Sequence, residues 1–322
     1  MTKPALMVGL GEVLWDILPS GKVLGGAPAN FAYMTNVLGD QGIVASRVGE
    51  DDLGREARKV MEGLGLNTAH LQSDPEHKTG TASVVIDRDG QPTFTISEFV
   101  SWDFLQWTPE WDELSGKADV ICFGSLAQRA PTSAATIERF LQNAPEDALR
   151  ICDVNLRQSF YNLELLRKSF RHAHILKLNE HELFEVSSLF TLGAGSDETL
   201  AKRLLRECAL RLVCVTRGAR GSLLISADQT VAHAGFHVKV ADSVGAGDAF
   251  TACLAHEYLR GRSLEEMSQA ANRFASWVAT QTGATPPISP TQLHNILTGV
   301  EIPSEADLLG GTAAKATEQE AP

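Results

Sequence analysis

The sequence predicts an α/β fold in which a doubly wound, mostly parallel β-sheet is flanked by helices and carries a small β lid. Three observations predict it. From residue 118 onward, short apolar runs alternate with segments whose apolar residues recur at helical spacing. A glycine-rich junction joins a strand-like run to a helix near each end of the chain. Between residues 79 and 96, two alternating runs interrupt this order and indicate a hairpin.

The first part of the chain predicts two strand–helix pairs. A short apolar run at 6–10 suits a buried strand, and Ser20-Gly21 signals a turn. Gly25-Gly26-Ala27-Pro28-Ala29-Asn30 then opens a helix, because proline fits a first turn, and Gly39 fits its end. A strand over 43–48 and a helix over 51–65 follow.

The hairpin predicts the lid. Two β-branched runs at 81–86 and 93–96 flank Asp87-Arg88-Asp89-Gly90, and Asp-Gly between such runs is a strong hairpin signal. We expect residues of about 11–27 and 79–105 to form a β lid outside the main sheet.

The second half predicts repeated parallel βαβ units. Strands are expected at 120–123, 150–154, 175–178 and 212–216, and helices at 132–144, 163–171, 180–188 and 197–207. Antiparallel additions are expected at 223–225 and 235–240, before two helices at 247–260 and 264–281. Residues 1–300 would form one domain, and 301–322, with few large apolar groups, a disordered tail.

The composition indicates which classes of binding partner and which cellular compartment suit the protein. The 322 residues include 28 Lys and Arg against 40 Asp and Glu, a net charge of −12, which argues against nucleic acid or an anionic membrane. Five cysteines without a C-x-x-C pair fit a reduced, cytoplasmic protein. The N-terminal residues lack the apolar core of a signal peptide, and no apolar run approaches the roughly 18 residues that span a membrane.

The stretch from Val240 to Phe250 carries the clearest chemical signal. Gly245-Ala246-Gly247 has almost no side-chain bulk and opens a helix, whose first amides form an anion-binding site. Asp248 lies in the first turn of that helix. Backbone donors beside a carboxylate are the two parts that phosphoryl transfer needs, one for the phosphoryl oxygens and one for the attacking hydroxyl. A helix N-terminus that is merely acidic is the alternative reading.

Further polar groups follow the predicted strands, where ligands bind in open α/β sheets. Each has an ordinary structural reading as well: Asn179 and Glu182 also form a capping box, Thr216-Arg217-Gly218 a tight turn, and Arg157 a surface ion pair. The histidines 172, 174, 181 and 233 lack the spacing of a zinc site. Among the tryptophans, which suit core packing, Trp102 is the best placed to stack on a ligand.

Three motifs together resemble the ribokinase-like (PfkB) family of sugar kinases. They are Gly25-Gly26-Ala27-Pro28-Ala29-Asn30, Asn179-x-x-Glu182, and the late Asp242-Ser-Val-Gly-Ala-Gly-Asp248. The match covers about residues 5–295. The resemblance implies a ribokinase-like fold and ATP-dependent transfer of phosphate to a sugar.

The resemblance also implies roles for individual residues. In catalysis Asp248 would be the base, Lys177 and Arg157 would add positive charge, and the anion hole would be formed by Gly245, Ala246 and Gly247. The sugar would be bound by Asp16, Gly25, Gly26, Asn30 and Trp102. The nucleotide would be bound by Thr216, Gly218, Gly221, Asn272 and Asn179. Magnesium would be held through water by Asn179 and Glu182, and a monovalent cation, potassium, by Asp242, Val244 and Gly283.

The acceptor sugar follows from finer similarity. Gly-Gly-Ala-Pro-Ala-Asn, Gly11-Glu12-x-x-x-Asp16 and Asp153-x-Asn155-Leu156-Arg157 are similar to fructokinases, which implies D-fructose. Ribose, 2-keto-3-deoxygluconate, a nucleoside or a phosphorylated sugar are alternative substrates, and a non-catalytic sugar- or nucleotide-binding regulator is an alternative function. In this family lids often pair between subunits, so the resemblance also implies a homodimer through the lid.

Overall fold

A computed structural model describes residues 3–19, 21–86 and 92–299. Over these residues the main sheet has nine strands in the order β13-β12-β11-β10-β9-β8-β1-β4-β5. Its neighbours are parallel except for β12 and β13, which add antiparallel strands at one edge. The predicted doubly wound, mostly parallel sheet is therefore confirmed.

Except for β5 and β13, which were not predicted, the strands of the main sheet lie close to where the sequence predicts them. They are β1 Leu6–Leu10, β4 Gln41–Gly49, β5 Leu71–Asp74, β8 Val120–Phe123, β9 Leu149–Asp153, β10 Ile175–Asn179, β11 Leu212–Thr216, β12 Ser222–Ile225 and β13 Thr230–His233. The strand expected at 235–240 is wrong, because the last strand ends at His233 and Gly235, with φ +84, packs against the Ala219 carbonyl and turns the chain away. The short strand β5 was not predicted, because its four residues, Leu-Gln-Ser-Asp, show no alternation of apolar and polar side chains.

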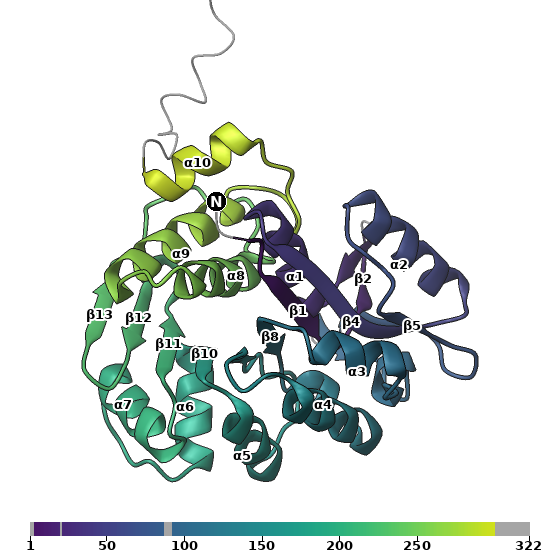
Figure 1. Ribbon diagram of the computed structural model, residues 1–322, viewed down its shortest axis with the longest axis horizontal. Coiled ribbons are helices and arrows are strands. Elements are labelled where there is room, and N and C mark those ends of the chain that lie inside the picture. The colour runs from purple at the N-terminus through teal and green to yellow at the C-terminus, as the bar shows by residue number, and fades with distance from the viewer. Residues whose placement is uncertain (1–2, 20, 87–91, 300–322) are drawn as a thin grey trace, which may run out of the picture.

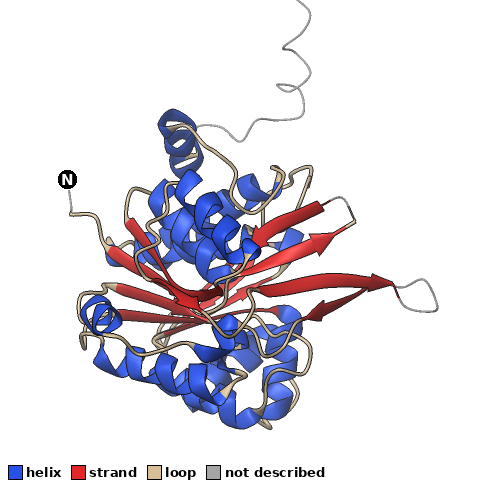
Figure 2. Cartoon of the chain, turned by 90° about the vertical axis from the view of Figure 1, so that its right-hand side faces the viewer, coloured by secondary structure: helices blue, strands red, loops and turns tan. Residues whose placement is uncertain are grey.

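Helices cover both faces of the sheet, as Figure 2 shows. One face carries α1 Ala27–Val37, α2 Asp52–Gly63, α8 Ala246–Leu259 and α9 Leu264–Ala279, with α10 Pro290–Thr298 packed on α9 (Figure 1). The other carries α3 Pro109–Ser115, α4 Pro131–Asn143, α5 Leu163–His172, α6 Glu180–Leu189 and α7 Asp197–Glu207. Short 3₁₀ turns occur at η1 Ser101–Phe104, η2 Leu126–Gln128 and η3 Gly218–Arg220.

Strand side chains alternate between two apolar cores, one on each face. Met7 and Cys122 belong to the core under α1 and α8, whereas their neighbours Val8 and Phe123 belong to the core under α3 to α7. Because successive strand residues point to opposite faces, a strand covered on both sides reads as one continuous apolar run. This explains why the parallel strands were recognisable from sequence.

A second, smaller sheet stands beside the main one in the order β3-β2-β6-β7. Its strands are β2 Leu14–Leu18, β3 Gly21–Gly25, β6 Gly80–Ile86 and β7 Pro92–Ile96, and they fall inside the two segments expected to form a lid. The β6–β7 pair extends away from the body of the molecule in Figure 2. The Asp87–Gly90 turn and the 301–322 tail lie outside the described residues.

Helix α1 fits against the sheet through two glycines. A Cβ on Gly9 of β1 would lie 2.1 Å from the Pro28 carbonyl oxygen, and one on Gly42 of β4 would lie 2.0 Å from that of Ala32. Both distances are far below van der Waals contact, so only glycine allows this approach. Gly39, with φ +89, ends the helix as predicted.

Hydrogen bonds and ion pairs with the buried Asp40 connect the C-terminal end of α8 to the turn after α1. Asp40 accepts hydrogen bonds from Arg260 and from the Ala5 amide at 3.1 Å each, and its carboxylate lies 2.7 Å from His256 Nδ1. Burial would raise the pKa of Asp40, but the bonds from His256 and Arg260 hold it at about 2. No helix in the described part of the chain is long and apolar enough to cross a membrane.

The contact between α1 and β4 makes a stability prediction. Gly42→Ala should lower the free energy of unfolding by about 1–3 kcal/mol, because the added methyl forces α1 away from the sheet. The matched control is Gly63→Ala at the end of α2, where nothing lies within 4 Å of the added Cβ. Urea unfolding of both variants measures the difference. An unchanged midpoint for Gly42→Ala would show that the helix can move without cost.

Candidate active site

The order of strands reverses at β1, which marks the place where this type of sheet binds ligands. From β1 the chain runs outward to β4 and β5 on one side, then returns to β8 on the other. In open α/β sheets the crevice beyond the carboxyl ends at such a point receives the ligand. A small cavity of about 10 Å³ lies there, lined among others by Glu12 after β1, Phe123 of β8, Asp153 of β9, and Asp248 of α8.

The N-terminus of α8 points backbone donors at this crevice. Gly245 is its N-cap, with φ +77, and a Cβ there would lie 2.7 Å from Ala284, so this tight turn requires glycine. The first helical bond runs from the Ala249 amide to the Gly245 carbonyl. The Ala246 amide donates to the Ser243 carbonyl at 3.3 Å, whereas the amides of Gly247 and Asp248 come before the first helical bond and can donate to an anion. Gly245, Ala246 and Gly247 therefore lie where the sequence placed them.

Asp248 is a partly exposed carboxyl held by a neighbour 218 positions away in sequence. Asn30 Nδ2 of α1 donates to Asp248 Oδ2 at 2.8 Å. Burial raises the pKa of Asp248 to about 6, and the charge of Asp153 adds to the rise, whereas Lys177, the Asn30 bond and Arg157 oppose it. A carboxyl with a pKa near neutrality suits a general base.

Lys177 supplies the nearest buried positive charge. Its Nζ lies 3.0 Å from both carboxylate oxygens of Asp153, and a Cβ on Gly247 would come within 3.0 Å of it. Burial alone would lower the pKa of Lys177, but the carboxylates of Asp153, Asp248 and Glu182 raise it, so the side chain is charged. The ammonium group thus lies directly beside the α8 N-terminus, where an anion would need it.

Three of the residues predicted to bind the sugar, Asp16, Gly25 and Gly26, lie in or directly after the small sheet. A Cβ on Gly25 would lie 2.5 Å from Asp16 Oδ2, and one on Gly26, with φ +115, would lie 2.5 Å from the Glu12 carbonyl. Burial raises the pKa of Asp16, and Arg157 opposes the rise. Arg157 also acts on Asp248 and Glu12, so its exposed guanidinium balances three carboxyls around one crevice.

Trp102, predicted to contact the sugar, does not border the small cavity at Asp248. The side chain is fully buried in η1, and the Arg129 guanidinium lies 4.0 Å from its ring centre. A Cβ on Gly80 would lie 2.2 Å from its Nε1. Trp102 therefore packs against the start of β6 and is buried in this conformation, and its contact with the sugar stays a prediction.

The predicted nucleotide residues are partly brought together. Thr216 ends β11, Gly218 opens η3 with φ +55, and a Cβ on Gly221 would lie 2.2 Å from the His233 carbonyl. Asn272, by contrast, is buried in α9, and its amide donates to Ser222 Oγ and the Ser268 carbonyl at 2.7 Å each. Its amide nitrogen is therefore engaged within the protein, and its role at the nucleotide stays a prediction.

The predicted magnesium residues form the capping box of α6. Asn179 Oδ1 accepts the Glu182 amide at 2.9 Å, and Glu182 Oε2 accepts the Asn179 amide at 2.8 Å. The other oxygen of Glu182 accepts the Leu156 amide at 2.9 Å. Both carboxylate oxygens are thus engaged by backbone, which suits a metal bound through water. Three or more His, Cys, Asp or Glu side chains in a metal-binding arrangement do not occur among the residues described.

Asp242, Val244 and Gly283 come together although 39 positions separate the last two. Asp242 Oδ1 accepts the Val244 amide at 3.0 Å, and Oδ2 accepts the Gly283 amide at 3.1 Å. Asp242 therefore ties the loop before α8 to the loop after α9. This fixes the carbonyl groups of two loops beside the α8 N-terminus.

Most of the chain is similar to sugar kinases. Residues 20–292 match the family model described as pfkB family carbohydrate kinase. The chain belongs to this family. A fructokinase of Escherichia coli is 31% identical over 259 residues, which cover 76% of this chain and 81% of that protein.

Solved structures share the fold of this pfkB-family chain. A fructokinase from Xylella fastidiosa with bound ATP has a TM-score of 0.79 at 21% identity, covering 93% of this chain and 99% of that one. A fructokinase double mutant from Vibrio cholerae O395, in a form with fructose, ADP and potassium ion bound, has a TM-score of 0.74 at 23% identity, covering 92% and 98%. The ribokinase-like architecture inferred from the three motifs is thereby confirmed.

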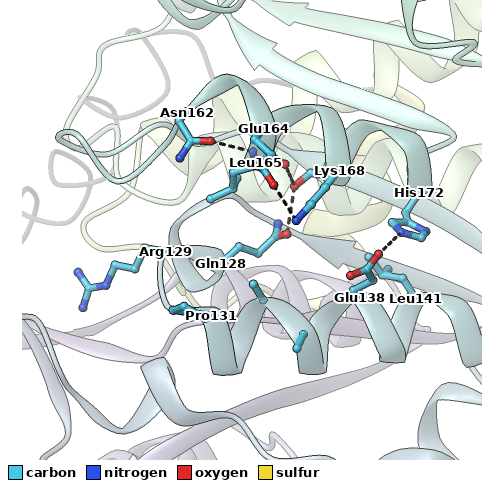
Figure 3. Close-up of a pocket in the computed structure, with 13 residues that line it drawn as sticks. Gln128, Arg129, Pro131, Glu138, Leu141, Asn162, Glu164, Leu165, Lys168 and His172 are labelled. Carbon is cyan, nitrogen blue, oxygen red and sulfur yellow. Dashed lines mark hydrogen bonds and ion pairs between the residues drawn. The ribbon is translucent and has the colours of Figure 1, made fainter.

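Sequence reasoning assigned no role to Glu12, Asp153 or Thr251. The Thr251 hydroxyl lies 3.0 Å from both Asp153 Oδ2 and the Gly247 carbonyl, so it joins the Lys177 pair to α8. Asp153 is the last residue of β9, and Glu12 lies two residues after the end of β1. Their position at the carboxyl ends of strands is the sequence signal that could have identified them as site residues. A larger groove of about 330 Å³ lies between α4 and α5 (Figure 3), and none of its lining residues borders the cavity at Asp248.

The bond between Asn30 and Asp248 predicts a measurable pKa change. Asn30→Ala should raise the pKa of Asp248 above about 6, because the bond favours the charged carboxylate. Carbon NMR of aspartate-labelled protein measures it, with the signal assigned through Asp248→Asn. Asn36→Ala, at the end of the same helix, is the control that should leave this titration in place. A pKa that stays the same or falls would contradict the assigned bond.

Proposed function

We propose that this pfkB-family kinase transfers the γ-phosphoryl group of ATP to a primary hydroxyl of a ketose, and that the ketose is D-fructose. The observation that carries the proposal is the partly exposed Asp248 carboxyl, with a pKa of about 6, placed at the α8 N-terminus beside Lys177. The similar proteins named fructokinase support the choice of sugar.

The described residues divide the reaction between two sides of one crevice. Asp248 takes the proton as the hydroxyl oxygen bonds to phosphorus and the bond to ADP breaks. Lys177, Arg157 and the amides of Gly245 to Gly247 offset the charge on the equatorial oxygens, which is the main demand of phosphoryl transfer. Asp16, Gly25, Gly26 and Asn30 hold the sugar hydroxyls.

On the nucleotide side, Thr216, Gly218 and Gly221 would contact the ATP phosphates and ribose. Magnesium would arrive with ATP and be held through water by Asn179 and Glu182, because backbone amides already occupy both Glu182 oxygens. Magnesium tends to keep several water ligands, so this arrangement fits it. When bound, it neutralises charge on the phosphate oxygens.

The loops joined by Asp242 fit a potassium ion. Carbonyl oxygens are suitable ligands for such a cation, and the bonds from Val244 and Gly283 hold the two loops together at that place. A potassium ion in the Vibrio cholerae structure supports this proposal. The four-stranded sheet would close over the sugar and exclude water, and its outer edge would pair two subunits into a dimer.

A coupled assay for ADP release tests the function. The purified protein is supplied with ATP and, separately, with D-fructose, ribose, 2-keto-3-deoxygluconate, a phosphorylated sugar and a nucleoside, with and without magnesium and potassium. Turnover with the highest kcat/KM for fructose is expected. A higher kcat/KM for another acceptor would replace fructose, and sugar binding without turnover would favour a regulator.

Asp248→Asn should lower kcat by about 10²–10⁴-fold, because general-base help is lost while the shape of the side chain is kept. ATP affinity, measured by calorimetry, should change little. Asp147→Asn, an exposed change before β9, is the matched control. Near-normal turnover of Asp248→Asn would show that this carboxyl is not the base.

The pH dependence follows from the raised pKa of Asp248. Only the ionised carboxyl accepts a proton, so kcat/KM should fall about tenfold for each pH unit below about 6. An ordinary aspartate would keep its activity down to about pH 4. A flat profile between pH 6 and 4.5, with the protein still folded, would contradict the assignment.

Asp242→Ala should abolish activation by potassium, because the two loops lose the side chain that joins them. The ratio of kcat with potassium to kcat with sodium should approach one. Asp228→Ala, at an exposed turn after β12, is the control. A ratio unchanged from the wild-type protein would place the cation elsewhere.

A further inference from the structure

Glu12 is a buried carboxyl group that none of the roles above uses. It follows β1 at the point where the strand order reverses, and 4% of its surface is exposed. Its Oε2 atom is buried and accepts no hydrogen bond from any described residue. A buried polar atom without a partner costs about 1–3 kcal/mol, so its retention calls for a role.

The cavity beside Glu12 has room for one water molecule. Its volume of about 10 Å³ is close to the minimum that a single water needs. Four polar side chains border it: Glu12 in the loop after β1, Asp153 of β9, and Asp248 and Thr251 of α8. The other lining residues, including Pro28, Phe31 and Phe123, are apolar. Such a cavity supplies the two to four polar partners that an ordered water requires.

The charges around Glu12 favour its neutral form. Burial raises the pKa of Glu12 to about 7; the backbone amides of Glu12 and Ala27 and the charge of Arg157 oppose the rise, and the negative Asp248 adds to it. Two other groups near the cavity add little net charge beside Glu12. Asp153 is paired with Lys177. Burial raises the pKa of the Cys122 thiol on β8, so this thiol stays neutral. On β2, burial raises the pKa of Asp16, and the positive charge of Arg157 opposes this rise too.

Two carboxyls that border one small cavity do not both ionise easily, and the proton stays on the one whose charged form is less favoured. That is Glu12, because its side chain is buried and its Oε2 has no partner, whereas Asp248 is partly exposed and accepts the Asn30 bond that favours its charged form. A protonated Glu12 has a hydrogen to donate, whereas an ionised one could only accept.

We propose that Glu12 is a positioning residue for phosphoryl transfer: its neutral carboxyl donates to one water molecule in this cavity, and that water donates to Asp248. The bond through water and the direct bond from Asn30 together fix the orientation of the Asp248 carboxylate toward the sugar hydroxyl. This role rests on the proposed kinase function, because its readout is the reaction that Asp248 performs.

Two variants of Glu12 show whether its role depends on a hydrogen-bond donor or on the charge of its carboxylate. Glu12→Gln keeps the size and an N–H donor, so kcat should stay within about threefold of the wild-type protein at pH 6.5. Glu12→Met keeps the volume without a donor, and kcat should fall about 10- to 100-fold with little change in KM, as expected for a misaligned reacting group. Glu113→Gln, on the exposed side of α3, is the control for a lost carboxylate.

The pH profile gives a readout that a merely structural role would not move. Glutamine cannot lose its proton, so the activity of Glu12→Gln relative to the wild-type protein should rise as pH passes above about 7. Equal loss in Glu12→Gln and Glu12→Met, or full activity of Glu12→Met, would overturn the proposal. Circular dichroism and the melting temperature confirm that both variants fold.

A crystal structure tests the same role without turnover, so the failure of the kinase function can be told from the failure of this inference. It should show one water within hydrogen-bond distance of both Glu12 Oε2 and Asp248 in the wild-type protein and in Glu12→Gln, but no such water in Glu12→Met. A cavity without water in the wild-type crystal would overturn the proposal whether or not sugar is phosphorylated. Absence of ADP release with every sugar would instead overturn the kinase function.

Discussion

The site depends on holding the carboxylate of Asp248 beside the N-terminus of α8, where a second negative group would bind. Burial and Asp153 make this carboxyl hard to ionise, whereas Asn30 and Lys177 make it easier, and the balance leaves the pKa of Asp248 near 6. The Lys177–Asp153 pair keeps a positive charge at the same place. A base and an anion site can therefore coexist without excessive repulsion.

The rest of the fold keeps α1 and α8 in fixed positions. Near its start α8 meets Asn30 of α1, and at its end His256 and Arg260 meet Asp40, just after α1. Gly9 and Gly42 let α1 lie against the sheet at the point where the strand order reverses. Two helices more than 200 positions apart in sequence thus together hold the reacting groups in place.

Local signals allowed much of this to be predicted from the sequence. The glycines before Asp248 and the proline in the first turn of α1 act through their own backbone, so their roles are visible without tertiary structure. Burial is a tertiary property, so the sequence did not show that Trp102, predicted at the sugar, and Asn272, predicted at the nucleotide, both have buried side chains. Glu12 was quoted in a motif but given no role, because its unpartnered oxygen and its cavity exist only when β1, α1, β9 and α8 come together.

A crystal structure of the protein with ADP and D-fructose would test the central claim most directly. The account predicts a primary hydroxyl of the sugar within about 2.6–3.2 Å of an Asp248 carboxylate oxygen, and the β-phosphate facing the amides of Gly245 to Gly247. Fructose bound in the crevice with Asp248 turned away from every hydroxyl, or ADP bound at another helix terminus, would contradict it.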